Sequence, residues 1–193
     1  MKTELILLAA GQSKRFGGIK QLADIHGQPM VCHCLSQYRQ GENWIEGIYQ
    51  GHVVLGSNAQ LISENLPINV VKFVVNTWLQ GMGHTLAQSM QVVATDTSHV
   101  MIGLADQVSI TQQIVIRMLC ESNRHPKHIV AAAYAGGVGA PVIFPRPYFS
   151  QLSQLTGDKG AKALLAQYPQ QIIRLDISEA EIDIDTVKDL KRI

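Results

Sequence analysis

The sequence predicts a Rossmann-like α/β protein of three layers, in which helices cover both faces of a mostly parallel central sheet. Apolar segments rich in β-branched residues alternate with segments of helical periodicity along the 193 residues. The predicted strands are apolar throughout, which is typical of strands buried on both faces. This alternation favours an α/β/α arrangement, and the length fits a single domain over residues 1–193.

Each element is predicted from its own pattern. Runs of apolar and β-branched residues indicate strands, and these runs are Leu5–Ala10, His52–Leu55, Val70–Val75, His99–Leu104, Ile129–Tyr134, Val142–Phe144 and Ile172–Leu175. Helical patterns occupy Pro29–Tyr38, a segment capped by Ser57 or Asn58 that extends to Leu66, Gly83–Val93, Thr111–Asn123, Gly160–Tyr168 and Thr186–Ile193. Pro29 suits the first helical position because the N–H it lacks is unpaired there.

Composition excludes several classes of protein. Lys and Arg number 16 against 15 for Asp and Glu, so the net charge is +1, and 16% of residues are charged. This balance excludes a disordered charged tail and argues against binding to nucleic acid through phosphate neutralisation. No apolar run approaches the ~20 residues of a membrane span, and the amino terminus does not resemble a secretion signal. Three cysteines are too few for a disulfide framework, so we expect a cytoplasmic protein.

The segments that directly follow strands are the candidate ligand-binding segments. Ligands of open α/β sheets bind beyond the carboxyl ends of the strands. The segments concerned are Gly11–Lys20, Asn76–Gly83, Ala105–Val108 and Gly136–Ala140. We expect the glycine-rich residues Tyr134–Ala140 to be a mobile loop over the site.

The loop after the first strand has the composition of a phosphate-binding loop. Ala9, Ala10 and Gly11 are small enough to let the backbone approach a ligand closely, and Arg15 and Lys20 follow. Successive N–H groups of such a loop can form an anion-binding concavity, to which Arg and Lys add charge. The spacing matches neither G-x-G-x-x-G nor the P-loop pattern. A surface loop with solvated charges is therefore the alternative.

Three aspartates are candidates for a metal site. Asp106 follows an apolar strand, where an aspartate is often only a turn former or a helix cap. Asp183 and Asp185 alternate with isoleucines, so both carboxylates lie on one side of an extended segment. We assign Asp185 more to capping the last helix, where Thr186-x-x-Asp189 resembles a capping box, and Asp183 more to metal. Mg²⁺ takes hard oxygen ligands, and Asp106 and Asp183 supply such a pair if their segments converge.

Six segments, taken in order, resemble one family. They are Leu8–Lys20, Asn76–Met82, Leu104–Gln107, Gly139–Phe144, Gly157–Lys162 and Asp183–Leu190. Together they are similar to the signature motifs of the molybdenum cofactor cytidylyltransferase branch of the nucleotidyltransferase superfamily, which has a MobA-like NTP transferase domain. The likeness spans nearly the whole chain. The departures are Val108 and Val187 in place of proline, Lys162 in place of arginine, and His84-Thr85 in place of a serine-rich pair.

The resemblance implies a fold of the nucleotide-diphospho-sugar transferase type and a Mg²⁺-dependent nucleotidyltransferase. The expected reaction transfers CMP from CTP to molybdenum cofactor and releases pyrophosphate. The resemblance implies nucleotide contacts from Leu8, Ala9, Ala10, Gly11, Arg15, Lys20, Asn76 and Gly81, catalytic roles for Arg15, Lys20 and Asp106, and Mg²⁺ ligation by Asp106 and Asp183. The expected partners are CTP and molybdenum cofactor, with a client molybdoenzyme as an optional third. Neither nucleic acid nor a membrane is expected.

Three alternatives stay open. A nucleotidyltransferase of the same fold would use GTP as donor, or a sugar or polyol phosphate as acceptor. The residues Leu8-Ala9-Ala10-Gly11 are similar to the cytidylyl branch and favour CTP. A non-catalytic carrier or chaperone of the mature cofactor would have less need of triphosphate ligands. A dinucleotide-binding oxidoreductase is disfavoured because no G-x-G-x-x-G pattern follows the first strand.

Overall fold

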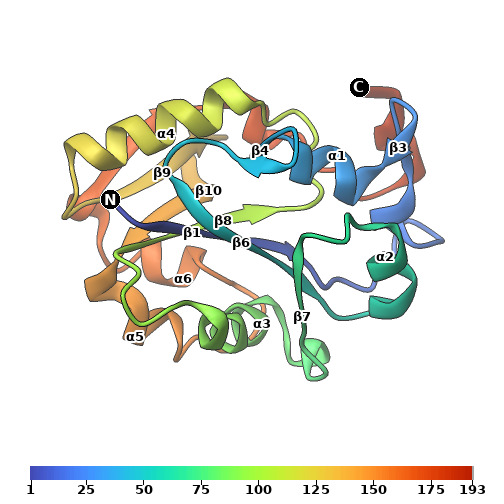
Figure 1. Cartoon of the computed structure of the whole chain (residues 1–193), viewed down its shortest axis with the longest axis horizontal. Coiled ribbons are helices and arrows are strands. Elements are labelled where there is room, and N and C mark those ends of the chain that lie inside the picture. The colour runs from blue at the N-terminus through green and yellow to red at the C-terminus, as the bar shows by residue number, and fades with distance from the viewer. Residues whose placement is uncertain (193) are drawn as a thin grey trace.

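A seven-stranded sheet forms the centre of the computed structural model, which describes residues 1–192. The strand order is β11 (Ile172–Asp176), β9 (Ile129–Tyr134), β10 (Gly137–Pro145), β8 (His99–Leu104), β1 (Thr3–Ala9), β6 (Ile48–Leu55) and β7 (Val71–Val74). Each neighbouring pair is parallel except the two pairs that β10 makes with β8 and β9. The predicted mostly parallel sheet is confirmed, and Figure 1 shows it running through the middle of the molecule.

Helices cover both faces of this sheet (Figure 1). One face packs against α1 (Met30–Ser36), α2 (Ala59–Asn65) and α4 (Gln112–Arg124), and the other packs against α3 (Met82–Ser89), α5 (Phe149–Leu152) and α6 (Lys162–Leu165). Strand β1 serves both faces because successive side chains of a strand point to opposite sides. Leu5 and Leu7 pack in the first layer, and Ile6 and Leu8 pack in the second. The predicted three-layer arrangement is confirmed.

Short elements connect these layers. Two-residue strands pair as β2 (Asp24–Ile25) with β3 (Gln28–Pro29) and as β4 (Arg39–Gln40) with β5 (Asn43–Trp44). The 3-10 helices are Lys20–Leu22, Trp78–Gln80, Met90–Val92, Arg146–Tyr148, Pro169–Gln171, Ser178–Glu181 and Val187–Arg192. Within residues 1–192, every helix is too short or too polar to cross a lipid bilayer.

Two predicted features are wrong in kind. Pro29 does not begin the first helix: it is in an extended conformation, pairs with Asp24 in the β2–β3 hairpin, and precedes the helix at Met30. Residues Tyr134–Ala140 belong to the β9–β10 hairpin instead of a mobile loop. Ala135 and Gly136 form the two-residue turn of this hairpin with φ of 48° and 74°, the backbone sign that matches the twist of paired strands.

Two predicted helices differ in extent. The helix expected over Gly160–Tyr168 is the single turn Lys162–Leu165. The helix expected over Thr186–Ile193 is the 3-10 helix Val187–Arg192, and its predicted end, Ile193, lies outside the described residues. Both segments are short, and the stability of helices of this length depends on tertiary packing.

The chain that follows β11 returns to the carboxyl end of β8. The N–H of Ile184 donates to the carbonyl oxygen of Asp106 at 3.2 Å. The Ile184 side chain is fully buried in a small apolar cluster that includes Met30 of α1. Because Asp183 and Asp185 flank this buried isoleucine, its packing brings both carboxylates beside Asp106.

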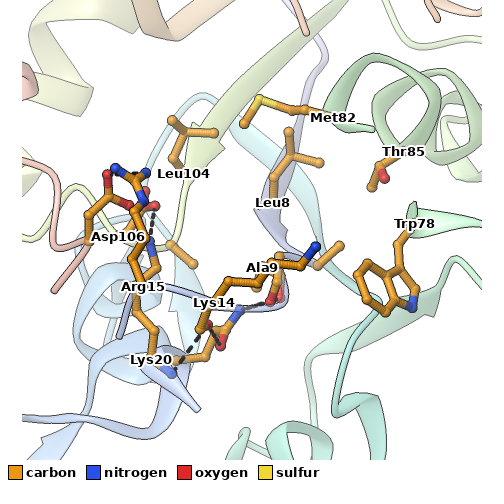
Figure 2. Close-up of a pocket in the computed structure, with 16 residues that line it drawn as sticks. Leu8, Ala9, Lys14, Arg15, Lys20, Trp78, Met82, Thr85, Leu104 and Asp106 are labelled. Atoms are coloured by element: carbon orange, nitrogen blue, oxygen red, sulfur yellow. Dashed lines mark hydrogen bonds and ion pairs between the residues drawn. The ribbon is translucent and has the colours of Figure 1, made fainter. Parts of the chain in front are cut away.

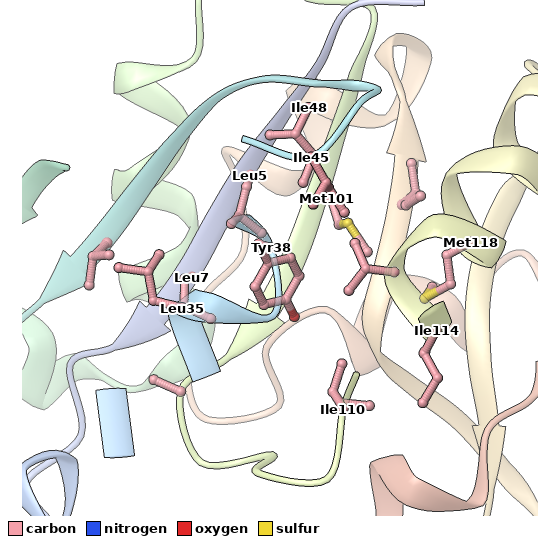
Figure 3. Packing of buried hydrophobic residues seen from close by; sticks show 14 of the residues in the cluster. Leu5, Leu7, Leu35, Tyr38, Ile45, Ile48, Met101, Ile110, Ile114 and Met118 are labelled. Atoms are coloured by element: carbon pink, nitrogen blue, oxygen red, sulfur yellow. The ribbon is translucent and has the colours of Figure 1, made fainter. Parts of the chain in front are cut away.

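Tyr38 occupies the centre of the first core layer (Figure 3). It is 2% exposed and lies over β8, where Gly103 leaves room for the phenol ring. A Cβ atom at position 103 would overlap the Tyr38 hydroxyl oxygen and would lie 3.3 Å from Cδ1 of Leu7. The close packing of Tyr38 and Leu7 therefore explains why this position of β8 is a glycine.

We expect Gly103→Ala to lower the free energy of unfolding by about 1–3 kcal/mol, the usual cost of overpacking a core. Thermal and urea unfolding would measure the change. Gly137→Ala is the matched control, because the nearest atom to a Cβ there is 3.9 Å away, and it should leave stability nearly unchanged. Tyr38→Phe should recover part of the loss in a double variant. A Gly103→Ala protein as stable as the wild type would contradict this account of Tyr38.

Candidate active site

A cavity of about 300 Å³ opens at the carboxyl ends of β1 and β8. Its lining comes from the loop after β1, the start of the loop after β8, the segment around α3 and the carboxy-terminal segment. The lining residues are Leu8, Ala9, Ala10, Gly11, Ser13, Lys14, Arg15, Lys20, Gln21, Trp78, Met82, Thr85, Leu104, Ala105, Asp106 and Asp185. Figure 2 shows the charged side chains gathered on one side and Trp78, Thr85 and Met82 on the other.

The loop after β1 offers backbone donors to this cavity. Within the described chain, the N–H groups of residues 11–15 donate no hydrogen bond to any protein acceptor. Ser13 has a φ of 59°, a left-handed conformation that turns the direction of successive N–H groups. Unpaired backbone donors in such a turn form a concavity that binds anions. The phosphate-binding interpretation of this loop therefore has the required donors.

Lys20 lies between two carboxylates. Its Nζ is 2.7 Å from Oδ2 of Asp106 and 3.2 Å from Oδ1 of Asp185, and its side chain is 12% exposed. Burial alone would lower the pKa of Lys20, but the charges and hydrogen bonds of Asp106 and Asp185 outweigh burial and raise the pKa above its usual value. Lys20 therefore carries its positive charge at every physiological pH. Arg15 reaches the other side of Asp185, with 2.7 Å between Nη2 and Oδ2.

Asp183 is the third carboxyl of this group. Burial, followed by the charges of Asp106 and Asp185, raises the pKa of Asp183 from 3.8 to about 6. One buried oxygen of Asp183 and one of Asp106, Oδ1 in both, have no hydrogen-bond partner. Buried oxygens without partners are costly unless a cation or donor reaches them. These two oxygens are the atoms at which a hard cation fits.

The described residues contain no group of three or more His, Cys, Asp or Glu side chains placed to hold a metal ion. Two carboxylates alone make an incomplete site. Mg²⁺ commonly takes one or two carboxylates and completes its shell with substrate phosphates and water. A cation at Asp106 and Asp183 would therefore depend on a phosphate-bearing ligand.

The structure brings most predicted site residues together. Leu8, Ala9, Ala10, Gly11, Arg15, Lys20 and Asp106 line the cavity, whereas Asn76, Gly81 and Asp183 are not among its lining residues. Gly81 has a structural explanation: its φ is 104°, and a Cβ there would overlap the backbone of Gly157 and the side chain of Asp158.

The assignment of Asp185 to helix capping is wrong. Its carboxylate accepts hydrogen bonds from Lys20 and Arg15, and Asp189 instead accepts from the backbone N–H groups of Asp185 and Thr186, at 3.1 and 2.7 Å. The capping pattern in the sequence is therefore real, but it uses Asp189 and leaves Asp185 free to face the cavity.

Sequence reasoning missed several lining residues. Trp78, Met82 and Thr85 come from the 3-10 helix and α3 that follow β7. Trp78 and Met82 belong to the segment Asn76–Met82, which resembles a family motif, but only the tertiary fold shows that they line the cavity. Gln21 gave no signal, because a single glutamine after a lysine has no characteristic pattern.

Comparisons with known proteins agree with this geometry. The family model of the MobA-like NTP transferase domain matches residues 5–172. Nicotine blue oxidoreductase from Paenarthrobacter nicotinovorans is 30% identical, over 97% of this chain and 94% of that protein. The bifunctional protein GlmU of Pseudomonas putida F1 is 32% identical over 64% of this chain, which corresponds to only 26% of GlmU.

Among solved structures, the Rv0371c homologue from Mycobacterium sp. strain JC1 has a TM-score of 0.82 and 26% identity, covering 98% of this chain and 93% of that one. The likeness therefore covers nearly the whole chain. The predicted fold of the nucleotide-diphospho-sugar transferase type is confirmed. The chain belongs to the MobA-like NTP transferase domain family, and it is a nucleotidyltransferase.

Proposed function

We propose that this nucleotidyltransferase transfers CMP from CTP to molybdenum cofactor, in a reaction that depends on Mg²⁺ and releases pyrophosphate. The observation that carries the proposal is the meeting of a donor-rich loop, Lys20 and the carboxylates of Asp106 and Asp185 at one cavity, with the Asp183 carboxyl close enough to interact with both. A triphosphate requires many donors and positive charge, and its divalent cation requires carboxylate oxygens. The sequence Leu8-Ala9-Ala10-Gly11 supports CTP as the donor, because it resembles the cytidylyl branch of the family.

The triphosphate would lie along the loop after β1. The N–H groups of residues 11–15 are free to donate to its oxygens, and Arg15 and Lys20 supply positive charge in the same cavity. The side chain of Arg15 is 73% exposed where it contacts Asp185. Replacing this carboxylate with a phosphate as the partner of Arg15 therefore costs little free energy. Lys20 is held more firmly and would stabilise charge that develops on the leaving pyrophosphate.

Asp106 and Asp183 are the residues that would hold the divalent cation. Both carry a buried oxygen without a partner, and both offer the hard oxygen ligands that Mg²⁺ prefers. When bound, the cation would neutralise phosphate oxygens of the nucleotide. The carboxylate of Asp185 is paired with the side chains of Lys20 and Arg15. Its role would be to orient these two side chains instead of binding the divalent cation.

The acceptor would approach from the side of β9 and β10. Tyr134 and Lys162 meet over Gly139, where a Cβ would overlap the Tyr134 hydroxyl and lie 3.3 Å from Cε of Lys162. The charge of Lys162 acts on Asp183, and burial, followed by the charge of Asp183, raises the pKa of Tyr134. A cation and a phenol beside Asp183 suit an acceptor that carries a phosphate.

A phosphate acceptor needs no side-chain base. A phosphate monoester is largely ionised at neutral pH, so its oxygen attacks the α-phosphorus of CTP directly. The new bond joins this oxygen to the α-phosphorus, and the bond from the α-phosphorus to the β-phosphate oxygen breaks, with its electron pair leaving on pyrophosphate. Catalysis is then mainly alignment and charge stabilisation, which Arg15 and Lys20 are placed to provide.

An oxidoreductase is the second candidate, because nicotine blue oxidoreductase is similar over nearly its whole length. The discriminating experiment incubates the purified protein with MgCl₂, molybdenum cofactor and each of CTP, GTP, ATP and UTP, and measures pyrophosphate. NADH and NADPH oxidation are followed in parallel. Release with CTP alone supports the proposal, and release with GTP supports the nearest alternative. Binding of molybdenum cofactor without pyrophosphate release supports a carrier. Oxidation of NADH or NADPH supports the oxidoreductase.

Lys20→Met should lower kcat by about 10²–10³-fold, the usual effect of removing one group that stabilises transition-state charge. Pyrophosphate release at saturating CTP measures the effect, and circular dichroism checks the fold. Lys127→Met is the control. Lys127 is an exposed residue just before the amino end of β9, and the cavity lies at the carboxyl ends of the strands, at the other end of the sheet. Wild-type turnover by Lys20→Met would remove Lys20 from the mechanism.

Asp183→Asn should stabilise the protein at pH 7.5 without Mg²⁺, by about 1–2 kcal/mol. The pKa of Asp183 is raised to about 6 from 3.8, so the folded state binds the proton more tightly than the unfolded state. Stability therefore falls as the pH rises from about 4 to 6, and the asparagine variant avoids this loss. The gain should be absent at pH 4.

Thermal melts at pH 4 and pH 7.5, with and without MgCl₂ and CTP, test this prediction. Mg²⁺ with CTP should stabilise the wild type more than Asp183→Asn, because ligands stabilise the state that binds them. An Asp183→Asn protein that melts below the wild type at pH 7.5 contradicts the burial cost. Equal stabilisation of both proteins by Mg²⁺ with CTP contradicts the assignment of Asp183 to the cation.

A further inference from the structure

Gln21 is a buried polar residue that the chemistry above does not use. It directly follows Lys20, lines the cavity and is only 3% exposed. Buried glutamine is uncommon unless its amide is hydrogen-bonded. In this protein both ends of the amide have partners, and all of them belong to the last residue of β1 or to the loop that follows it.

The amide of Gln21 joins distant points of this loop. Its Nε2 donates to the carbonyl oxygens of Ala9 at 3.1 Å and of Gly11 at 2.9 Å. Its Oε1 accepts from Oγ of Ser13 at 3.1 Å, and that Oγ in turn accepts from the backbone N–H of Lys20 at 3.3 Å. The Gln21 side chain therefore holds the start of the loop and the left-handed residue Ser13. Through Ser13 it also holds the backbone of Lys20.

Gln21 also completes a pattern in the backbone. The carbonyl oxygen of Leu8 accepts from the N–H of Ala105 at 3.0 Å, and that of Ala10 accepts from the N–H of Ser57 at 3.1 Å. With the two bonds from Gln21, four successive carbonyl oxygens, those of residues 8–11, accept hydrogen bonds from within the protein. The segments that directly follow the neighbouring strands β8 and β6 supply two of these donors, and Gln21 supplies the other two.

This pattern has an electrostatic consequence. The N–H groups of residues 11–15 are unpaired, while the four carbonyl oxygens of residues 8–11 are held in protein hydrogen bonds. A polyphosphate on this loop would therefore meet donors and would be spared the repulsion of carbonyl dipoles. Without Gln21, the peptide groups at Ala9 and Gly11 would lose the bonds that set their orientation.

We propose that Gln21 is a positioning residue for the triphosphate of the nucleotide: it keeps two carbonyls turned away from the phosphates and, through Ser13, holds Lys20 in place. The inference rests on the proposed function, because it requires a nucleoside triphosphate in this cavity. An amide is the group that this role needs. Glutamate would lose both donors, and methionine has neither a donor nor a strong acceptor.

The test compares Gln21→Met with Gln112→Met. Nε2 of Gln112 also donates to two carbonyl oxygens, those of Ser36 and Arg39, but Gln112 is not among the lining residues of the cavity. Calorimetric titration with CTP and with inorganic tripolyphosphate, both with MgCl₂, measures binding, and initial rates give KM and kcat. Melting curves show that each variant is folded at the assay temperature.

Gln21→Met should weaken the binding of CTP and the binding of tripolyphosphate by the same factor, about 10-fold or more, because Gln21 affects only the contacts to the phosphates. KM for CTP should rise with that factor, and Gln112→Met should bind both probes like the wild type. Unchanged affinity of a folded Gln21→Met for tripolyphosphate would overturn the inference and leave the proposed function standing. A wild-type protein that binds neither probe would overturn both.

Ser13→Ala gives a second variant if Gln21→Met does not fold. It removes the link from Gln21 to the backbone of Lys20 while leaving the two carbonyl bonds of Gln21 in place. We expect it to lower kcat by about 5-fold, the effect of one hydrogen bond, with a smaller change in tripolyphosphate affinity. An Ser13→Ala protein with wild-type kcat and affinity would count against the inference.

Discussion

The ion pair of Lys20 with Asp106 and Asp185 depends on three segments of the chain meeting at the end of β8. β1 and β8 are neighbours in the sheet, so the loops that follow them leave from the same edge. The third segment arrives because Ile184 is buried and its N–H is bonded to Asp106. If that apolar contact were lost, the cavity would lose Asp185, and Asp183 would no longer be held near Asp106.

The site combines groups whose charges oppose one another. Burial, followed by the charges of Asp106 and Asp185, raises the pKa of Asp183, and this half-buried carboxyl therefore destabilises the fold at neutral pH. Lys20 offsets part of this repulsion within the protein. The buried oxygens of Asp106 and Asp183 that lack partners suit a ligand that brings its own positive ion, and in the proposed reaction the binding of such a substrate would recover the cost of assembling the carboxylates.

The loop after β1 and the carboxylates divide the work between backbone and side chains. The backbone offers hydrogen-bond donors whose direction is fixed by the fold, and the side chains offer charge. Donors that are already oriented stabilise a polyanion without the reorganisation that water would need. The cavity therefore combines unpaired backbone donors with three cationic side chains, those of Lys14, Arg15 and Lys20.

The sequence by itself determined the sheet strands, the loop after β1 and the identity of Lys20, Arg15 and Asp106 as site residues, because periodicity and local motifs are properties of adjacent residues. It also indicated that Asp183 and Asp185 share a face. Only the tertiary structure decided that Asp185 pairs with Lys20 instead of capping a helix, that residues 134–140 form a hairpin, and that Trp78 and Gln21 line the cavity. Those facts depend on contacts between residues far apart in the chain, and no local pattern encodes which distant donor, acceptor or apolar surface a side chain will meet.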